Sequence, residues 1–127
     1  MKRILFGALI IASTVFTPVF ASTYQFQSGP PVEYSLEPHA PQEFSNVFMW
    51  KVKATCKIIT QENEVPIKFT VIRKKGSVNN VSMAAGDPSM TLIFYPNQKV
   101  DIVAEAGGVV RMENLGEKTI SASCTTS

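Results

Sequence analysis

An alternation of apolar and polar residues beginning at Phe48 constrains the fold more than any other feature of this chain. A period of two places successive side chains on opposite faces of a β-strand, so the pattern predicts a long strand with one face on a core. Trp50 lies in phase with Cys56, and we expect it to pack in that core; the alternative role is a binding anchor. The apolar phase holds Phe48, Trp50, Val52, Ala54, Cys56 and Ile58, and the polar phase holds Lys51, Lys53, Thr55 and Lys57.

Further short strands follow at intervals of about ten residues, separated by turn residues. The segment 67–71 is expected to form an antiparallel hairpin with the strand before it. The segment 90–95 is apolar in both phases and is expected to be a central strand. About seven such strands predict an all-β fold, an antiparallel immunoglobulin-like β-sandwich. The expected strands after the first cover 67–71, 81–83, 90–95, 100–104, 109–112 and 118–124.

The two cysteines of the chain, Cys56 and Cys124, are predicted to form a disulfide. A bridge closing a loop of about seventy residues stabilises a fold by about 4 kcal/mol, because it restricts the unfolded chain. A redox role is not expected, because the pair forms no CxxC motif and lacks a charged setting that would activate a thiol. The sequence leaves open whether the bridge crosses two sheets or joins neighbouring strands.

The N-terminal segment 1–21 has the layout of a cleavable signal peptide. Lys2 and Arg3 precede an apolar run over 4–12, which is too short to span a bilayer comfortably. The β-branched Val19 and the small Ala21 stand where a signal peptidase reads the chain before Ser22. We therefore expect an exported protein, periplasmic or extracellular, with no stable membrane insertion after cleavage.

Charge argues against nucleic acid as a partner. The chain carries 12 basic and 10 acidic residues, and removal of Lys2 and Arg3 makes the two equal. Binding to nucleic acid or to an anionic membrane needs a net field or a clustered patch, and the case for either partner is weak here. The one basic cluster, Arg73-Lys74-Lys75, is expected to be a solvated strand end rather than an anion site.

The segment 22–45 is rich in proline and is expected to be an extended arm next to a β-sandwich domain over 46–127. Large apolar side chains in this segment indicate that it either packs across the domain, which we favour, or waits for a partner. Its prolines are Pro30, Pro31, Pro38 and Pro41, and its large apolar residues are Tyr24, Phe26, Tyr34 and Phe44.

Residues that could support catalysis or metal binding are sparse. His39 is the only histidine and lies in the arm, and Asp87 and Asp101 are the only aspartates. Glu105 and Glu113, on adjacent predicted strands, are the nearest pair of carboxylates, and we expect them to be solvated rather than catalytic. The sequence therefore predicts no catalytic residue, no metal site, no cofactor and no enzymatic activity.

Two segments carry a resemblance to a protein group. The runs Phe48-Met49-Trp50-Lys51-Val52-Lys53-Ala54-Thr55-Cys56 and Glu113-Asn114-Leu115-Gly116-Glu117-Lys118-Thr119-Ile120-Ser121-Ala122-Ser123-Cys124 resemble small, uncharacterised exported proteins of intracellular gammaproteobacteria with an immunoglobulin-like sandwich. The resemblance implies export and this fold, and it transfers no catalytic residue. Some proteins of this group are type II secretion substrates, so release from the cell is implied as well.

These observations favour a secreted, non-enzymatic binding module that engages a protein or cell-envelope partner. A host-directed factor and a hydrolase inhibitor, with the segment 84–89 plugging a cleft, are variants of this role. The alternative is a structural assembly subunit whose 22–45 arm adds a strand to a neighbour. The partner protein is not identified, and a monomer is expected. The candidate binding residues are Asp87, Ser89 and Tyr95.

Overall fold

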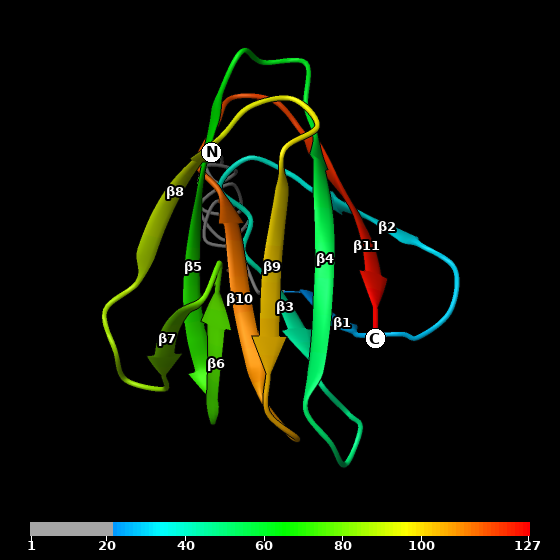
Figure 1. Ribbon diagram of the computed structural model, residues 1–127. Helices are drawn as coiled ribbons and strands as arrows, with labels where there is room; N and C mark the ends of the chain where they lie inside the picture. Colours follow the sequence, from blue (N-terminus) through cyan, green and yellow to red (C-terminus); the bar gives the residue numbers. More distant parts are fainter. Residues whose placement is uncertain (1–21) are drawn as a thin grey trace, which may run out of the picture.

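The computed structural model describes residues 22–127, so the predicted signal peptide over 1–21 lies outside the described residues. Within this range the chain forms eleven β-strands (Figure 1). No helix of residues 22–127 is long and apolar enough to cross a membrane. The strands are β1 (Ser22–Gln25), β2 (Val32–Leu36), β3 (Gln42–Ser45), β4 (Val52–Ile59), β5 (Val65–Arg73), β6 (Lys75–Val78), β7 (Val81–Ala84), β8 (Met90–Phe94), β9 (Lys99–Ala104), β10 (Val109–Asn114) and β11 (Ile120–Thr126).

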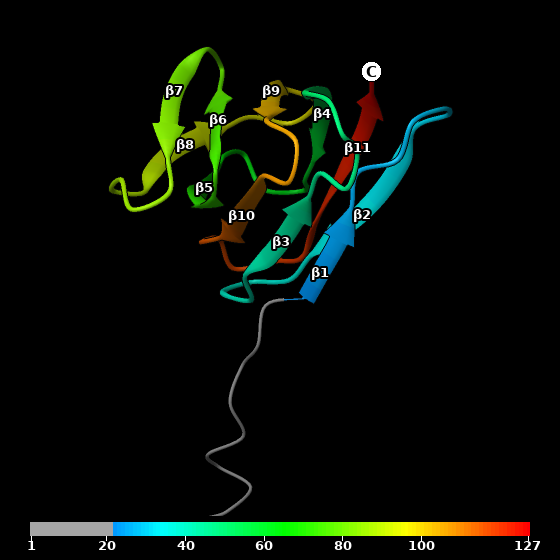
Figure 2. The same cartoon turned by 90° about the horizontal axis from the view of Figure 1, so that it is seen from below.

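The strands form two sheets, which lie as two layers in the view from below (Figure 2). The first sheet has the order β1-β3-β10-β5-β8, and the second has the order β2-β11-β4-β9-β6-β7. Each strand pair is antiparallel except β1 with β3, which run parallel. The prediction of an all-β fold built from antiparallel strands is therefore confirmed.

One apolar core lies between the sheets and is filled by alternate residues of their strands. The predicted alternation holds from Val52 to Ile58, where every second side chain is buried. Phe69 and Phe94 pack edge to face in the first sheet, with ring centres 6.0 Å apart. The second sheet contributes aliphatic residues such as Ile102 from β9. Alternation along each strand therefore decides which residues enter the core.

Residues 22–45 differ from the predicted arm beside a domain over 46–127. They supply β1 and β3 to the first sheet and β2 to the second, where β2 pairs with β11. The aromatic side chains of this segment form a cluster in the core in which Tyr34 meets Phe44 edge to face, with ring centres 5.1 Å apart. The segment thus packs as an integral part of both sheets.

The buried phenol of Tyr34 predicts a loss of stability in alkali. Its side chain is 4% exposed, and burial, followed by the charge of Tyr24, raises its pKa above the ordinary value of 10.0. The folded state then holds a proton that the unfolded state releases above about pH 10, so stability is full below that pH and falls as pH rises through the folded pKa. Urea unfolding of Tyr34→Phe should lose less stability than the wild type between about pH 9 and pH 11. Equal losses would contradict this assignment.

Two expectations on strand pairing are wrong. β5 does not form a hairpin with β4, because the two belong to different sheets and β5 pairs with β10 and β8. The connection over 60–64 therefore crosses from one sheet to the other. β8, expected to be central, lies at an edge of the first sheet, and its residue Ile93 is 46% exposed.

The predicted disulfide between Cys56 and Cys124 is present. It joins β4 to its neighbour β11 in the second sheet, where the two residues stand directly opposite each other with Cα atoms 3.9 Å apart. The bridge therefore joins neighbouring strands rather than the two sheets.

The strands run between two ends of the molecule. The end that is lower in Figure 1 carries the connections 46–51, 85–89 and 105–108, together with the corner between β5 and β6 at Lys74. The other end carries the turns 60–64 and 95–98, among others.

Candidate functional site

The three candidate residues from the sequence are not brought together. Asp87 lies in the connection between β7 and β8, where its Oδ2 accepts a hydrogen bond from the backbone N–H of Ala84 at 2.8 Å. Ser89 shares a hydroxyl hydrogen bond of 2.6 Å with Thr70. Tyr95 follows the far end of β8, roughly 20 Å from Ser89 at about 3.3 Å of strand per residue. Asp87 and Ser89 are thus engaged in local structure, and Tyr95 lies at the other end of the molecule.

Trp50 is not in the core, so the expectation that it packs beside the disulfide is wrong. β4 begins only at Val52, and Trp50 lies in the connection from β3, where its side chain is 61% exposed. Its ring stacks on Phe48, with ring centres 5.1 Å apart. The neighbouring Met49 is 90% exposed, and Val47 is 53% exposed. The connection therefore presents three large apolar side chains to solvent, and we call Val47, Met49 and Trp50 the apolar tip.

Asn46 determines how this connection is built. Its side chain is completely buried, and its amide nitrogen donates to the carbonyl oxygens of Trp50, Ala104 and Glu105 at 2.9, 3.0 and 3.1 Å. Its Oδ1 accepts from the backbone N–H of Phe48 at 2.9 Å. One buried amide thus links the loop, at Phe48 and Trp50, to the end of β9 where the chain crosses between the sheets. The apolar tip is held on a well-fixed loop.

The backbone of Asn46 also fixes this connection to the turn between β9 and β10. Its N–H donates to the carbonyl of Gly108 at 2.9 Å, and its carbonyl accepts from Gly107 at 3.0 Å. Gly107 has a φ of 76°, a conformation that favours glycine. The turn 105–108 therefore braces the loop that carries the apolar tip.

Four cations lie at the same end of the molecule as the apolar tip (Figure 1). Arg73 lines a shallow hollow of about 530 Å³ together with Met49, and the side chain of Lys74 lies over Gly107. Lys51 follows the apolar tip directly and lines a second hollow together with Lys75. The sequence separates these groups into two segments, and the fold gathers them at one end. We call Lys51, Arg73, Lys74 and Lys75 the basic rim, and the rim with the apolar tip the Trp50 surface.

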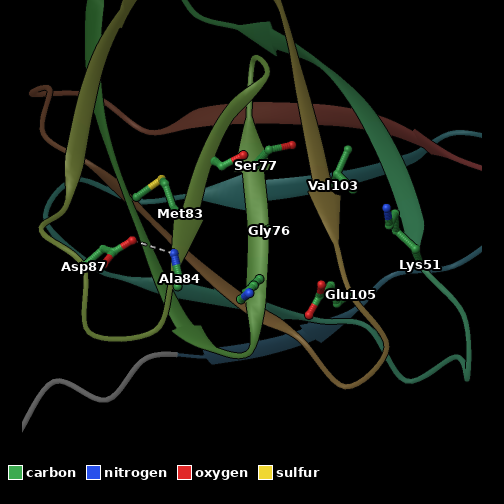
Figure 3. Close-up of a pocket in the computed structure, with 10 residues that line it drawn as sticks. Lys51, Gly76, Ser77, Met83, Ala84, Asp87, Val103 and Glu105 are labelled. Atoms are coloured by element: carbon green, nitrogen blue, oxygen red, sulfur yellow. Dashed lines mark hydrogen bonds between the residues drawn. The ribbon is translucent and has the colours of Figure 1, made fainter.

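The second hollow has a volume of about 380 Å³ and lies over β6, β7 and β9 (Figure 3). At Gly76 the backbone of β6 lies so close to β9 that a Cβ would clash with the carbonyl oxygen of Val103. Lys51 and Glu105 lie on one side of it and Asp87 on the other. The lining mixes amines, carboxylates and the hydroxyls of two serines, and it contains no histidine or cysteine.

The groups considered for catalysis and metal binding lie apart. Glu105 and Glu113 are not on neighbouring strands, because β9 and β10 belong to different sheets. Glu113 forms an ion pair with Lys68 at 3.4 Å. His39 is exposed in the connection between β2 and β3. Within 22–127 no group of three or more His, Cys, Asp or Glu side chains is placed to hold a metal ion.

The Trp50 surface is thus the strongest candidate site of the described chain, and comparison with known proteins adds nothing to it. No family model, curated protein or solved structure matches the chain. Sequence reasoning overlooked the site because the strand alternation was extended back to Phe48. One signal was present in the sequence. All four residues from Val47 to Trp50 are apolar, whereas a strand with one buried face needs an apolar residue only at every second position.

Replacing Asn46 with alanine should destabilise the protein and release the loop. The change removes four hydrogen bonds, including those to the carbonyl of Trp50 and from the N–H of Phe48, so we expect a loss of about 3 kcal/mol in the free energy of unfolding. Urea unfolding measures this loss, and the anisotropy of Trp50 fluorescence should fall as its loop gains freedom. The exposed turn residue Asn63 provides the matched control, Asn63→Ala. A loss below about 0.5 kcal/mol would show that Asn46 does not hold the loop.

Proposed function

We propose that this protein is an exported, non-enzymatic binding module that engages a protein or cell-envelope partner through the Trp50 surface. The observation that carries the proposal is the exposure of Met49 and Trp50 on a loop locked by buried Asn46. Exposed tryptophan and methionine side chains are costly to leave in water, and rigid aromatic anchors dominate binding energy at interfaces. A fixed loop also loses little conformational entropy on binding.

Export is supported by the signal-peptide pattern over 1–21 and by the disulfide, which suits an oxidising compartment. Periplasmic and extracellular locations both fit these two features. For the fold we propose an immunoglobulin-like β-sandwich, supported by two sheets around one core. The bridge between neighbours β4 and β11 differs from the bridge between sheets that is typical of antibody domains.

The alternative role, an assembly subunit that adds its 22–45 segment to a neighbour, is disfavoured. β1 and β3 pair with each other, β3 pairs with β10, and β2 pairs with β11. Donation to a neighbour would first break these pairs within the chain. The hydrolase-inhibitor variant is less well supported than the Trp50 surface. Its loop over 84–89 is fixed by two bonds between Ala84 and Asp87, but it exposes no large apolar side chain.

Capture of a partner by the immobilised, oxidised protein tests the proposal. The bait is offered intact envelope membranes, solubilised envelope and culture supernatant, beside the loop variant Met49→Ser/Trp50→Ser. The matched control, Ile93→Ser/Tyr95→Ser, removes two exposed apolar side chains from the edge strand β8 and the residue after it. We expect saturable binding of one component by wild type and control, and its loss in the loop variant. Retention by the loop variant would refute the proposal.

A further inference from the structure

We propose that the partner of the Trp50 surface is an anionic phospholipid bilayer. The apolar tip enters the headgroup layer, and the basic rim contacts lipid phosphates. This inference rests on the proposed function and specifies its partner.

The shape of the surface suits a soft, flat partner. Met49 is 90% exposed, so solvent surrounds it on almost all sides, and the hollow that it lines with Arg73 is shallow. The loop before β4 reaches beyond the strand ends at the lower end of Figure 1. A projecting apolar tip fits the fluid interface of a bilayer, where tryptophan is favoured at the level of the headgroups.

The charges around the tip are free to bind an anion. The three ion pairs among residues 22–127 use the cations Lys53, Lys68 and Arg111, and none uses the basic rim. Glu105 and Asp87 are the acidic residues near the rim, so cations are in excess there. Acidic and basic residues are equal in number over 22–127, so this excess is local rather than a property of the whole domain. Such a patch directs one end of the molecule toward a negative surface.

Two backbone groups of the loop are already engaged within the protein. The N–H of Phe48 and the carbonyl of Trp50 are both engaged by the side chain of Asn46. The side chains that the tip exposes are apolar except for the indole N–H of Trp50, and cations lie at the same end of the molecule (Figure 1). A folded acidic protein is recognised through about one hydrogen bond per 100–200 Å² of interface, whereas a bilayer needs no fixed pattern of donors and acceptors.

Vesicle binding by residues 22–127, which hold both sheets, the core and the disulfide, tests this inference. The probes are vesicles of phosphatidylcholine alone and of phosphatidylcholine mixed with phosphatidylglycerol. Trp50 is the only tryptophan of the chain, so its fluorescence reports the tip directly. We expect a blue shift, and quenching by brominated acyl chains, with the anionic vesicles only. Raising salt from about 0.1 M to about 1 M shortens the Debye length from about 10 Å to about 3 Å and should release the protein.

Variants separate the contributions of tip and rim. Lys74→Gln/Lys75→Gln should weaken sedimentation with anionic vesicles by about 25-fold, at about fivefold for each cation near the surface. The matched control Lys57→Gln/Lys99→Gln removes two exposed cations from neighbouring positions of β4 and β9 and should bind as the wild type does. Met49→Ser retains Trp50 as the reporter and should bind more weakly than wild type. Thermal unfolding checks that each variant is folded.

The outcomes separate this inference from the proposed function. Equal binding to both kinds of vesicle, no binding, or rim variants that bind like wild type would each overturn the lipid assignment. Saturable binding of polyglutamate without quenching by brominated lipid would overturn it in favour of an acidic protein. If the loop variant loses a captured partner while vesicles do not bind, the proposed function stands and the lipid assignment fails. If capture is unchanged in the loop variant, the proposed function itself fails.

Discussion

Deletion of residues 22–45 is expected to abolish folding. The deletion removes β1, β2 and β3 and exposes the backbone edges of β10 and β11, with which β3 and β2 pair. It also removes four large buried side chains, each contributing about 2 kcal/mol, against a total stability of about 5–15 kcal/mol. These side chains are Phe26, Tyr34, Leu36 and Phe44.

Circular dichroism and urea unfolding measure this effect, and a point variant makes it quantitative. Phe44 is almost completely buried, so Phe44→Ala should cost about 4 kcal/mol, while Glu37→Ala at an exposed position should cost little. A deleted chain that still unfolds cooperatively would mean that 46–127 folds alone and that the segment is an arm after all.

Loss of the Cys56–Cys124 bridge is expected to cost about 4 kcal/mol of stability. The bridge closes a loop with a sequence separation of 68, and both cysteines are buried between the sheets. In the loop-entropy model the cost arises because the reduced unfolded chain gains freedom. The variant Cys56→Ala/Cys124→Ala and the reduced wild type should both shift the midpoint of urea unfolding to lower concentration. If the oxidised and reduced proteins unfold at the same midpoint, the bridge contributes nothing.

Strand positions were largely predictable because alternation and turn residues are local signals. The segments expected at 81–83 and 90–95 correspond to β7 and β8, with small differences at their ends. Sheet membership was not predictable. The connection 60–64 is as compatible with a hairpin as with a crossing between sheets, and the choice depends on pairing between residues distant in sequence. The same holds for β8, whose apolar composition suggested a central position.

The prolines of 22–45 and Gly76 lie in strands or between them, where the sequence predicted no strand. Pro30 and Pro31 precede β2, and Pro38 and Pro41 lie between β2 and β3, so they separate strands rather than prevent them. The sequence predicted no strand at the position of β6, which contains Gly76. This glycine lies within a strand, where close approach of the carbonyl of Val103 leaves no room for a side chain.

The candidate site depended on tertiary structure more than the strands did. Arg73 lies more than twenty residues from Met49 in the sequence, and β10 brings their segments together, because Val109 pairs with Ser45 on one side and with Arg73 on the other. The exposure of Trp50 depends on Asn46, whose bonds to Ala104 and Glu105 span the two sheets. Alternation carries no information on such bonds, so it assigned Trp50 to the core.

Photo-crosslinking in exporting cells tests most directly whether the Trp50 surface is the site of binding. A benzophenone side chain is placed at Met49 in one protein and, as the matched exposed position on the edge strand β8, at Ile93 in another. The account predicts crosslinked lipid or protein adducts from position 49 and only background from position 93. Adducts that form equally at both positions, or at position 93 alone, would contradict it.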